Sequence, residues 1–259
     1  MKIPSIALKN GPSLALGPFR AWFHLRSATE VGWLVTEGLP VKPRSYVIIG
    51  CGHFGNLAAK KLLHQDAGSR ITVVDQDERT LRKISSLAVE TLVGEGISCL
   101  GQLLSSNRRI DYIIPAVPFH LAFEYILSKL KPFDMERGNV PPLDGLPNVT
   151  RGRTGDLYTS LADFLCPEDC PEPSGYCTVT GKRRKKPLYK QLMELTGPFE
   201  SRLIRSHQLA AGVGGFRPEA LNHLLEHLKM RTNVDRLILV STACRCHGVV
   251  SALSSSLRQ

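Results

Sequence analysis

From Tyr46 onward, short apolar runs alternate with amphipathic segments along the chain. The apolar runs have the length and composition of buried strands and occupy residues 46–49, 71–74, 89–93 and 110–114. The segments between them repeat apolar positions at helical spacing and occupy residues 54–65, 77–87, 97–105 and 118–130. Strands and helices that alternate in this way predict a parallel sheet with helices on both faces.

The alternation stops at residue 132 and resumes near residue 199. The segment between is rich in proline and contains three cysteines and a basic run. Helical patterning within it is limited to residues 157–165 and 188–195. After it, the sequence predicts strands at 200–206 and 236–241, a helix at 218–230 and an apolar tail at 248–253. We therefore predict an α/β protein with one six-stranded, doubly wound, mostly parallel Rossmann-type sheet and a Cys/Pro-rich insertion. Two separate domains are the alternative.

This reading divides the chain into four parts. They are an N-terminal extension (1–44), a dinucleotide-binding core (45–131), a Cys-rich basic insertion (132–198) and a strand–helix–strand segment that completes the sheet (199–259). Within the extension, residues 19–35 are patterned as a short helix and strand.

The sequence GCGHFG stands where the first predicted strand meets the first predicted helix. Gly50, Gly52 and Gly55 form the G-x-G-x-x-G pattern of dinucleotide-binding turns. In such turns the first glycine permits the tight bend, the second lets the backbone approach a pyrophosphate, and the third lets helix and strand pack closely. We include His53 and Phe54, which lie between the last two glycines, in the predicted nucleotide site.

Asp75 ends the second predicted strand, 20 residues after Gly55. An acidic side chain at this position accepts hydrogen bonds from ribose hydroxyls and repels a 2′-phosphate. We therefore expect NAD as the cofactor, and the nearby Arg79 keeps NADP as the alternative.

Three stretches of this region resemble the NAD-binding domain of the potassium-conductance regulators, the RCK or TrkA amino-terminal type. They are YVIIGCGHFGNLAAKKLL, ITVVDQDERTLRKI and VETLVGEG. The resemblance covers about residues 45–130 and implies a nucleotide-binding domain of regulatory type. It also implies that Glu95, where the family commonly has aspartate, lines the nucleotide site together with the three glycines and Asp75.

The region of the fourth strand also resembles a second protein family, more loosely. The stretch DYIIPAVPFHLAFEYIL resembles the saccharopine-dehydrogenase-like reductases. That resemblance implies that a residue following the fourth strand lies beside a nicotinamide ring.

The composition narrows the class of protein. The 259 residues are 42% hydrophobic and 22% charged, which is typical of a globular chain with a sizeable core. The net charge is +10, and the densest basic run is residues 182–186. Because no aromatic residues interleave with this run, it indicates a solvated loop, and we expect no nucleic-acid partner. An anionic small molecule and a homodimer stay open as partners.

No targeting or membrane segment is evident in the sequence. No apolar run approaches the ~20 residues that span a bilayer, so we expect no membrane span. Lys9 interrupts the apolar N-terminal stretch, which argues against a signal peptide. We therefore expect a cytoplasmic protein with reduced cysteines.

Five cysteines are the candidate metal ligands. Three stand close together in CPEDCPEPSGYC, and two stand in CRCHG: Cys166, Cys170, Cys177, Cys244 and Cys246. Clustered thiols in a reducing compartment indicate Zn²⁺ or an iron–sulfur cluster, because both prefer thiolate ligands. The C-x3-C-x6-C spacing matches neither pattern, so a loop of unligated cysteines is the alternative.

Two histidines are the candidate acid–base groups. His120 follows the fourth predicted strand, and His207 precedes a second Gly-rich turn at residues 212–215. Both are expected at the carboxyl edge of the sheet, where ligands bind in such folds. A structural role for either histidine is the alternative.

The sequence leaves three functions open. An NAD(H)-binding regulator or sensor is preferred, because no clear catalytic pair is present. An NAD-dependent oxidoreductase and an NADH-linked iron–sulfur redox protein are the alternatives.

Overall fold

The computed structural model describes residues 43–231 and 236–255. The helix and strand expected within residues 19–35 lie outside the described residues.

The first sheet is the predicted Rossmann-type unit. Its strands are β1 (Ser45–Ile49), β2 (Arg70–Asp75), β3 (Glu90–Val93) and β4 (Tyr112–Pro115). All pair in parallel, in the order β3-β2-β1-β4. The connecting helices are α1 (His53–Gln65), α2 (Glu78–Arg82), α3 (Gly96–Ser105) and α4 (Leu121–Leu130). The prediction of a parallel α/β sheet is therefore confirmed.

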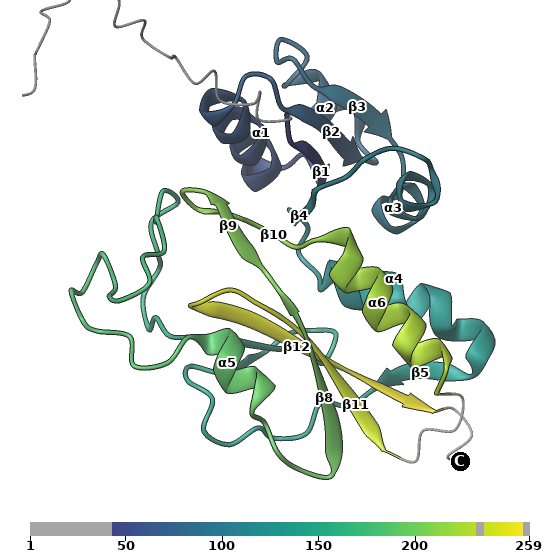
Figure 1. The fold of residues 1–259 in the computed structure, drawn as a ribbon, viewed down its shortest axis with the longest axis vertical. Helices are drawn as coiled ribbons and strands as arrows, with labels where there is room; N and C mark the ends of the chain where they lie inside the picture. Colours follow the sequence, from purple (N-terminus) through teal and green to yellow (C-terminus); the bar gives the residue numbers. More distant parts are fainter. Residues whose placement is uncertain (1–42, 232–235, 256–259) are drawn as a thin grey trace, which may run out of the picture. The chain divides into compact units, whose positions relative to one another are not determined.

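Alternate residues of β1 face opposite layers of this unit. Tyr46 and Ile48 pack in a core with α1 and α2, whereas Val47 and Ile49 pack in a core that includes α3 and α4. Figure 1 shows α1 and α3 on opposite sides of the sheet. Because both faces are covered, the strand reads as a continuous apolar run.

Within the described residues, the second sheet is mixed and has six strands. They are β5 (Met135–Gly138), β6 (Thr150–Arg151), β7 (Leu157–Ser160), β8 (Phe199–Arg205), β11 (Leu237–Ala243) and β12 (His247–Ser255). The order is β6-β7-β12-β11-β8, and β5 also pairs with β12. Only β8 and β11 pair in parallel; the other neighbours are antiparallel.

The expectation of one six-stranded sheet is therefore wrong, and the predicted C-terminal strands do not complete the first sheet. The outer edge of β4 is instead met by one residue, Phe216, which exchanges backbone hydrogen bonds of 2.8 and 2.9 Å with Ile113. The nine-residue strand β12 pairs along both edges, with β11 on one side and β5 and β7 on the other. Antiparallel partners thus satisfy its backbone groups within a separate sheet.

The helix expected at residues 157–165 is also absent, because this segment begins with strand β7. Leu157 and Thr159 are buried, whereas Tyr158 between them is exposed. This period of two is that of a strand with one buried face.

Helices cover both faces of the second sheet. The helix α6 (Pro218–Lys229) and α4 share a core with Ile238 and Val240, and Figure 1 shows these two helices side by side. The short α5 (Leu188–Met193) packs with Leu239 and Val250 on the other face. The described residues also form the hairpin of β9 (His207–Ala210) with β10 (Val213–Gly215), and the 3-10 helix η1 (Lys131–Phe133).

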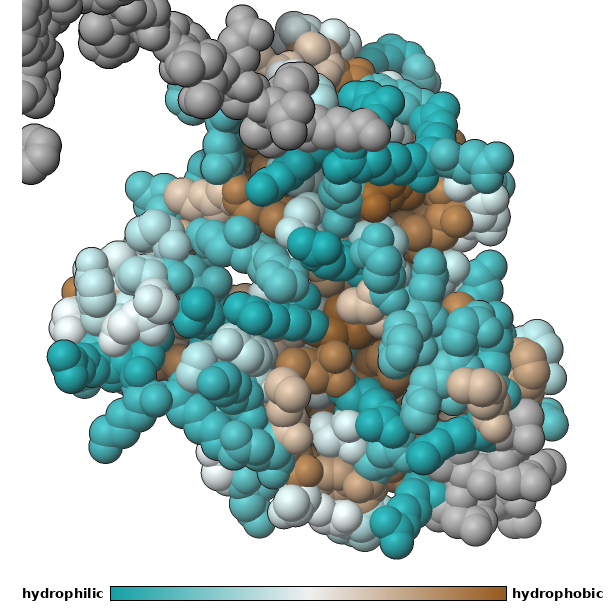
Figure 2. Space-filling model, viewed as in Figure 1, coloured by the Kyte–Doolittle hydropathy of each residue, from teal (hydrophilic) through white to brown (hydrophobic). Residues whose placement is uncertain are grey.

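Hydrophilic residues cover most of the face that Figure 2 shows. Within residues 43–231 and 236–255, no helix combines the length and apolar character needed to cross a membrane.

Candidate functional site

At two of the three glycines of the turn, the surrounding backbone leaves no room for a side chain. Gly50 has φ +100°, and a Cβ there would lie 2.4 Å from the carbonyl oxygen of Ala116. A Cβ on Gly55 would lie 1.9 Å from the carbonyl oxygen of Gly50. At Gly52, by contrast, a Cβ would meet no atom within 4 Å. Backbone atoms therefore pack closely against the first and third glycines of the turn, whereas the space beside the second glycine is open.

The open side of the turn is also the N-terminus of α1. Gly52 is the N-cap, no side chain caps the helix, and the first turn contains no acidic residue. The first N–H groups of α1 are thus free of side-chain acceptors on their own helix. Such a helix end attracts anions through its free N–H groups and its positive dipole end.

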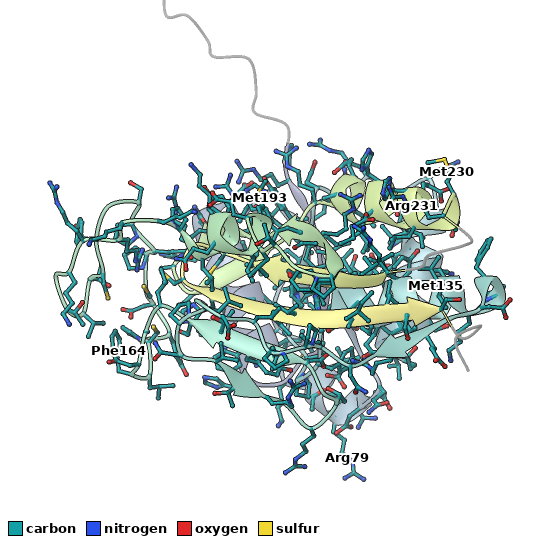
Figure 3. All side chains as sticks on the ribbon, turned by 90° about the horizontal axis from the view of Figure 1, so that it is seen from below. Arg79, Met135, Phe164, Met193, Met230 and Arg231 are labelled. Carbon is teal, nitrogen blue, oxygen red and sulfur yellow. The ribbon has the colours of Figure 1, made fainter. Side chains whose placement is uncertain are left out.

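Asp75 lies at the carboxyl end of β2 and is joined to the turn. One carboxylate oxygen accepts a 2.6 Å hydrogen bond from the backbone N–H of Cys51, and the other accepts one of 2.9 Å from Asp77. Arg79, which motivated the NADP alternative, is exposed and extends away from the ribbon in Figure 3.

Glu95 caps α3. Its two carboxylate oxygens accept hydrogen bonds from the backbone N–H groups of Ile97 (2.9 Å) and Ser98 (2.7 Å). The sequence assigned Glu95 to the nucleotide site, and this capping role is an additional one. Two apolar side chains are unusually exposed near these loops: Val93 at the end of β3 is 60% exposed, and Phe54 is 64% exposed.

The Cys-rich segment contacts the glycine turn directly. His53 Nε2 lies 2.7 Å from a carboxylate oxygen of Glu168. From the same helix, Lys61 donates hydrogen bonds of 2.8 Å to the carbonyl oxygens of Glu168 and Ala211. Sequence reasoning did not identify Glu168 or Lys61, although an acidic residue between two predicted ligand cysteines was a visible signal.

The β9–β10 hairpin holds the other side of this segment. The backbone N–H of Gly212 donates a 2.9 Å hydrogen bond to the carbonyl of Cys170, and Gln208 donates one of 2.8 Å to the same oxygen. A Cβ on Gly212 would lie 1.8 Å from the carbonyl oxygen of Glu168. The second glycine loop of the sequence therefore packs against the chain's own Cys-rich segment.

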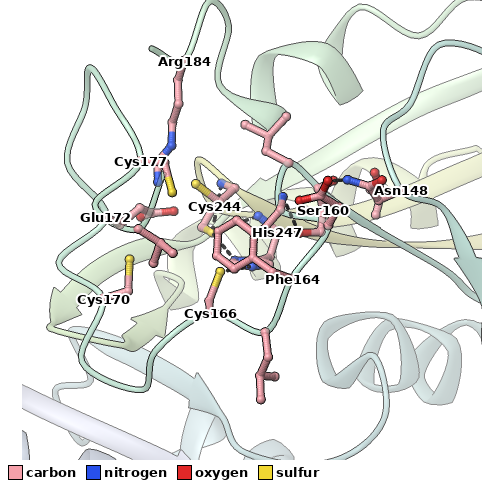
Figure 4. Close-up of a pocket in the computed structure, with 18 of the residues that line it drawn as sticks. Asn148, Ser160, Phe164, Cys166, Cys170, Glu172, Cys177, Arg184, Cys244 and His247 are labelled. Atoms are coloured by element: carbon pink, nitrogen blue, oxygen red, sulfur yellow. Dashed lines mark hydrogen bonds between the residues drawn. The ribbon is translucent and has the colours of Figure 1, made fainter. Parts of the chain in front are cut away.

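The five predicted ligand cysteines line one pocket of about 1340 Å³, which we call the thiol pocket. His247 and the basic residues 182–186 also line it, and Phe54 links it to the glycine turn. Figure 4 shows the sulfurs of Cys166, Cys170 and Cys177 near the Cys244–His247 segment. The structure thus brings together cysteines that are up to 80 residues apart in the sequence (166 to 246).

The thiols of this pocket have different tendencies to ionise. Burial, followed by the nearby Glu172, raises the pKa of Cys244 to about 12, and burial raises that of Cys246 to about 12. Burial also raises the pKa of Cys166. Backbone hydrogen bonding from Thr180 is the largest of the effects that lower the pKa of Cys177 to about 7.

The predicted zinc or iron–sulfur site is not assembled in the described part of the chain. There, no group of three or more His, Cys, Asp or Glu side chains is placed so that it could hold a metal ion. The metal site therefore stays a prediction.

His120, one of the two predicted acid–base groups, is 3% exposed and both ring nitrogens have partners. Nδ1 lies 2.8 Å from the Ser251 hydroxyl, and Nε2 lies 2.8 Å from the Thr242 hydroxyl. Because Ser251 donates to Asp156, Nδ1–H donates to Ser251, and Nε2 accepts from Thr242. Burial lowers the pKa of His120 to about 3, so the ring is neutral at physiological pH.

His207, the other predicted acid–base group, begins β9 and is half-buried. Its ring makes an edge contact with Tyr112, with centroids 6.1 Å apart. Burial, followed by the charges of Arg205 and Arg217, lowers its pKa. A neutral imidazole at this position is a base rather than an acid at physiological pH.

Comparisons with known proteins match two parts of the chain to family models. Residues 46–100 match the TrkA-N domain, which confirms the predicted resemblance and makes this part an NAD-binding, Rossmann-type domain. Residues 122–256 match the AF_1314_C model, described as "Uncharacterized protein, C-terminal domain". The resemblance to saccharopine-dehydrogenase-like reductases stays a prediction.

One similar protein spans both parts. It is an "Uncharacterized protein" from Archaeoglobus fulgidus, 30% identical over 224 residues, which are 80% of this chain and 98% of the relative. No solved structure matches the chain.

Proposed function

This chain belongs to the AF_1314_C family, and we propose that it is an NAD(H) sensor in which dinucleotide binding changes how residues 166–172 are held. The TrkA-N domain supports the nucleotide-binding half of this proposal. The contact of residues 166–172 with the glycine turn supports the responding half.

We assign the ligand contacts from the turn and the strand ends. The pyrophosphate would lie over Gly52, where the backbone is open and the N–H groups of α1 are free of side-chain acceptors. Asp75 would accept hydrogen bonds from the ribose, because each of its oxygens retains a lone pair beyond its backbone partner. The exposed Val93 would contact the adenine, with Glu95 shaping the loop beside it. His53 and Phe54 would flank the phosphates.

The observation that carries the proposal is the 2.7 Å contact between His53 and Glu168. His53 directly follows Gly52, so the carboxylate of Glu168 occupies the surroundings of the proposed phosphate site. A negatively charged pyrophosphate and this carboxylate repel each other. Binding of the dinucleotide therefore weakens the Glu168 contact, and by reciprocity the Glu168 contact weakens binding.

The size of this coupling follows from the exposure of the two groups. The side chains of His53 and Glu168 are 67% and 54% exposed, so water screens the pair. Exposed pairs of this kind contribute up to about 1 kcal/mol, which corresponds to about a fivefold change in affinity.

Calorimetric titration with NAD⁺ and NADH, combined with hydrogen exchange, tests the proposal. Glu168→Gln should bind NADH up to about fivefold more tightly than the wild type. NADH should also accelerate exchange in residues 166–172 of the wild type. Glu219→Gln, which removes an exposed carboxylate from the first turn of α6, is the matched control. Absence of dinucleotide binding, or binding that leaves exchange in residues 166–172 unchanged, contradicts the proposal.

An NAD-dependent oxidoreductase is the second candidate, and the thiol pocket is the observation that favours it. The pocket lies beside Phe54 of the turn and is lined by basic residues, which suits an anionic small molecule. His207 stays the candidate base, because both ring nitrogens of His120 already have partners. It lies between two residues that line the pocket, Ser206 and Gln208, and is not itself part of the lining. Reduction of NAD⁺ by anionic hydroxy compounds, in which His207 accepts the hydroxyl proton as hydride leaves for NAD⁺, would favour this candidate if it is lost in His207→Asn.

A further inference from the structure

Two separate segments of the thiol pocket point backbone N–H groups at a cysteine sulfur. Cys244 Sγ accepts from the N–H groups of Cys246 (3.4 Å) and His247 (3.3 Å). Cys177 Sγ accepts from the backbone N–H groups of Val179 and Thr180. In both segments the donors stand two and three residues after the cysteine. Such donors stabilise negative charge on sulfur, which a metal-bound thiolate carries.

A third thiol lies at ligand spacing from an imidazole. Cys166 Sγ is 3.5 Å from Nε2 of His247. Sulfur and nitrogen ligands on neighbouring corners of a tetrahedral Zn²⁺ site lie about 3.5 Å apart, given Zn–S and Zn–N bonds of about 2.3 and 2.0 Å. The other ring nitrogen, Nδ1, faces Cys244 Sγ at 3.9 Å. His247 therefore lies between a thiol of the Cys-rich loop and a thiol of the β11–β12 turn.

The Cys-rich loop is anchored to this turn at several points along its length. The N–H of Leu161 donates to the carbonyl of Cys246, and that of Leu188 donates to the carbonyl of Arg245, both at 2.8 Å. Between them, Glu172 accepts a 2.8 Å hydrogen bond from the N–H of Arg245. Because the loop is tethered at both ends, its cysteines can approach Cys244 without rearrangement of the sheet.

The charges around the pocket suit a group of thiolates. Arg184 lines the pocket, and Figure 4 shows its side chain beside Cys177. Lys182, Arg183, Lys185 and Lys186 also line the pocket, so its cations outnumber its carboxylates, which are Asp163, Glu168 and Glu172. A cluster of three or four thiolates around a divalent ion keeps a net negative charge, which these cations offset.

We propose that the thiol pocket binds a thiophilic metal centre through Cys166, Cys177 and Cys244, with His247 or Cys170 as the fourth ligand. The shared chemistry is thiolate ligation, which a single Zn²⁺ ion or an iron–sulfur cluster satisfies. Since no such group is preassembled in the described residues, the ligands close around the metal as it binds. Binding replaces the thiol protons, which are released to solvent.

The site is separate from nucleotide binding but connected to it by one segment. Glu168 stands between Cys166 and Cys170 and contacts His53 in the glycine turn. Closure of the loop around a metal would thus set the position of the carboxylate that opposes the dinucleotide.

Metal analysis of the full chain, purified without chelator under anaerobic conditions, tests the proposal. We expect each protein chain to contain about one zinc ion, or iron together with acid-labile sulfide. Metal-free protein titrated with Co²⁺ should develop the near-ultraviolet absorption of cobalt–thiolate bonds. Zinc with the cobalt signal identifies a mononuclear site, and iron with sulfide identifies a cluster. Protein that carries neither metal and gives no cobalt–thiolate absorption overturns the proposal.

Variants distinguish a real ligand set from general thiol binding. Cys166→Ser, Cys177→Ser and Cys244→Ser should each lower metal affinity by at least about tenfold. Cys99→Ser, in α3 and outside the pocket, is the matched control. Loss in Cys170→Ser or in His247→Asn identifies the fourth ligand. Circular dichroism and NADH titration show that each variant is folded. Equal metal affinity in all cysteine variants overturns the metal proposal, even if the proposed NAD(H) sensor function holds.

Discussion

The backbone N–H of Cys51 donates a 2.6 Å hydrogen bond to the carboxylate of Asp75, so the predicted ribose acceptor is fastened to the glycine turn itself. The strand end and the turn come from segments 24 residues apart. Their connection places the proposed phosphate and ribose contacts in one rigid arrangement.

Asp75→Ala should therefore weaken NADH binding by about 10- to 100-fold. The variant removes a charged acceptor for the ribose, worth about 1.5–3 kcal/mol, and also a partner of the turn. Calorimetric titration measures the change. Asp66→Ala, at the C-cap of α1, removes an exposed carboxylate from the other end of the same helix and should bind NADH like the wild type. Equal affinity in Asp75→Ala and the wild type would disprove the assignment of Asp75.

Two glycines of the turn should respond differently to the same added methyl group. In Gly55→Ala the Cβ meets the carbonyl oxygen of Gly50 at 1.9 Å, so the free energy of unfolding should fall by about 1–3 kcal/mol. In Gly52→Ala the Cβ enters open space at φ −63°, so thermal stability should be retained while NADH affinity falls. Thermal melts and titrations of the two variants measure both effects. A Gly52→Ala variant with unchanged NADH affinity would place the pyrophosphate elsewhere.

Gly212→Ala should loosen residues 166–172 without changing any charge. Its Cβ would lie 1.8 Å from the carbonyl oxygen of Glu168, and the residue has φ +73°. Hydrogen exchange of residues 166–172 should become faster, and NADH affinity should rise as in Glu168→Gln. Gly145→Ala is the control, because φ is +80° there but no atom lies within 4 Å of the added Cβ. Similar exchange in the two variants would show that backbone strain, rather than the clash, controls the segment.

The buried His120 should make stability depend on pH below neutrality. Its pKa falls from 6.5 to about 3 on folding, so the unfolded chain binds the additional proton between these values. The contribution to stability is complete above pH 6.5, decreases as the pH falls and is lost below about pH 3, with a slope of up to about 1.4 kcal/mol per pH unit. Asp156, whose pKa is lowered from 3.8, contributes at lower pH.

Denaturant unfolding between pH 4.5 and 7 measures this slope. His120→Gln, which has no titratable ring, should flatten the slope in this range while lowering stability at pH 7. An unchanged slope in His120→Gln would assign the pH dependence to other groups.

Local patterns predicted the first sheet well because its strands are covered on both faces. Residues 46–49 form a continuous apolar run, and they are β1 with little change of boundary. Asp75 ends β2 as the spacing from Gly55 predicted. The same reasoning failed at residues 157–165, where two buried positions alternate with an exposed tyrosine in a strand of only four residues.

The sequence also identified the chemistry-bearing residues of the candidate sites, but not their neighbours. The five predicted ligand cysteines share one pocket, although their spacing matched no known pattern. The contacts of Glu168 and Lys61 were not predicted, because they join segments more than 100 residues apart. His120 followed the predicted strand end, yet its ring is enclosed by hydroxyls of the second sheet.

The sequence by itself determined the parallel α/β unit, its glycine turn and the acidic strand end, because these depend on contacts within one βαβ repeat. Tertiary structure alone decided which sheet the C-terminal strands joined. The apolar pattern predicts strands at β8 and β11 and an apolar tail at β12, but it does not show which edge they pair with. Phe216 covers the outer edge of β4, and β12 pairs with antiparallel partners on both sides, so these strands satisfy their backbone in a second sheet. That sheet brings the β11–β12 turn to the Cys-rich loop and creates the thiol pocket beside the glycine turn.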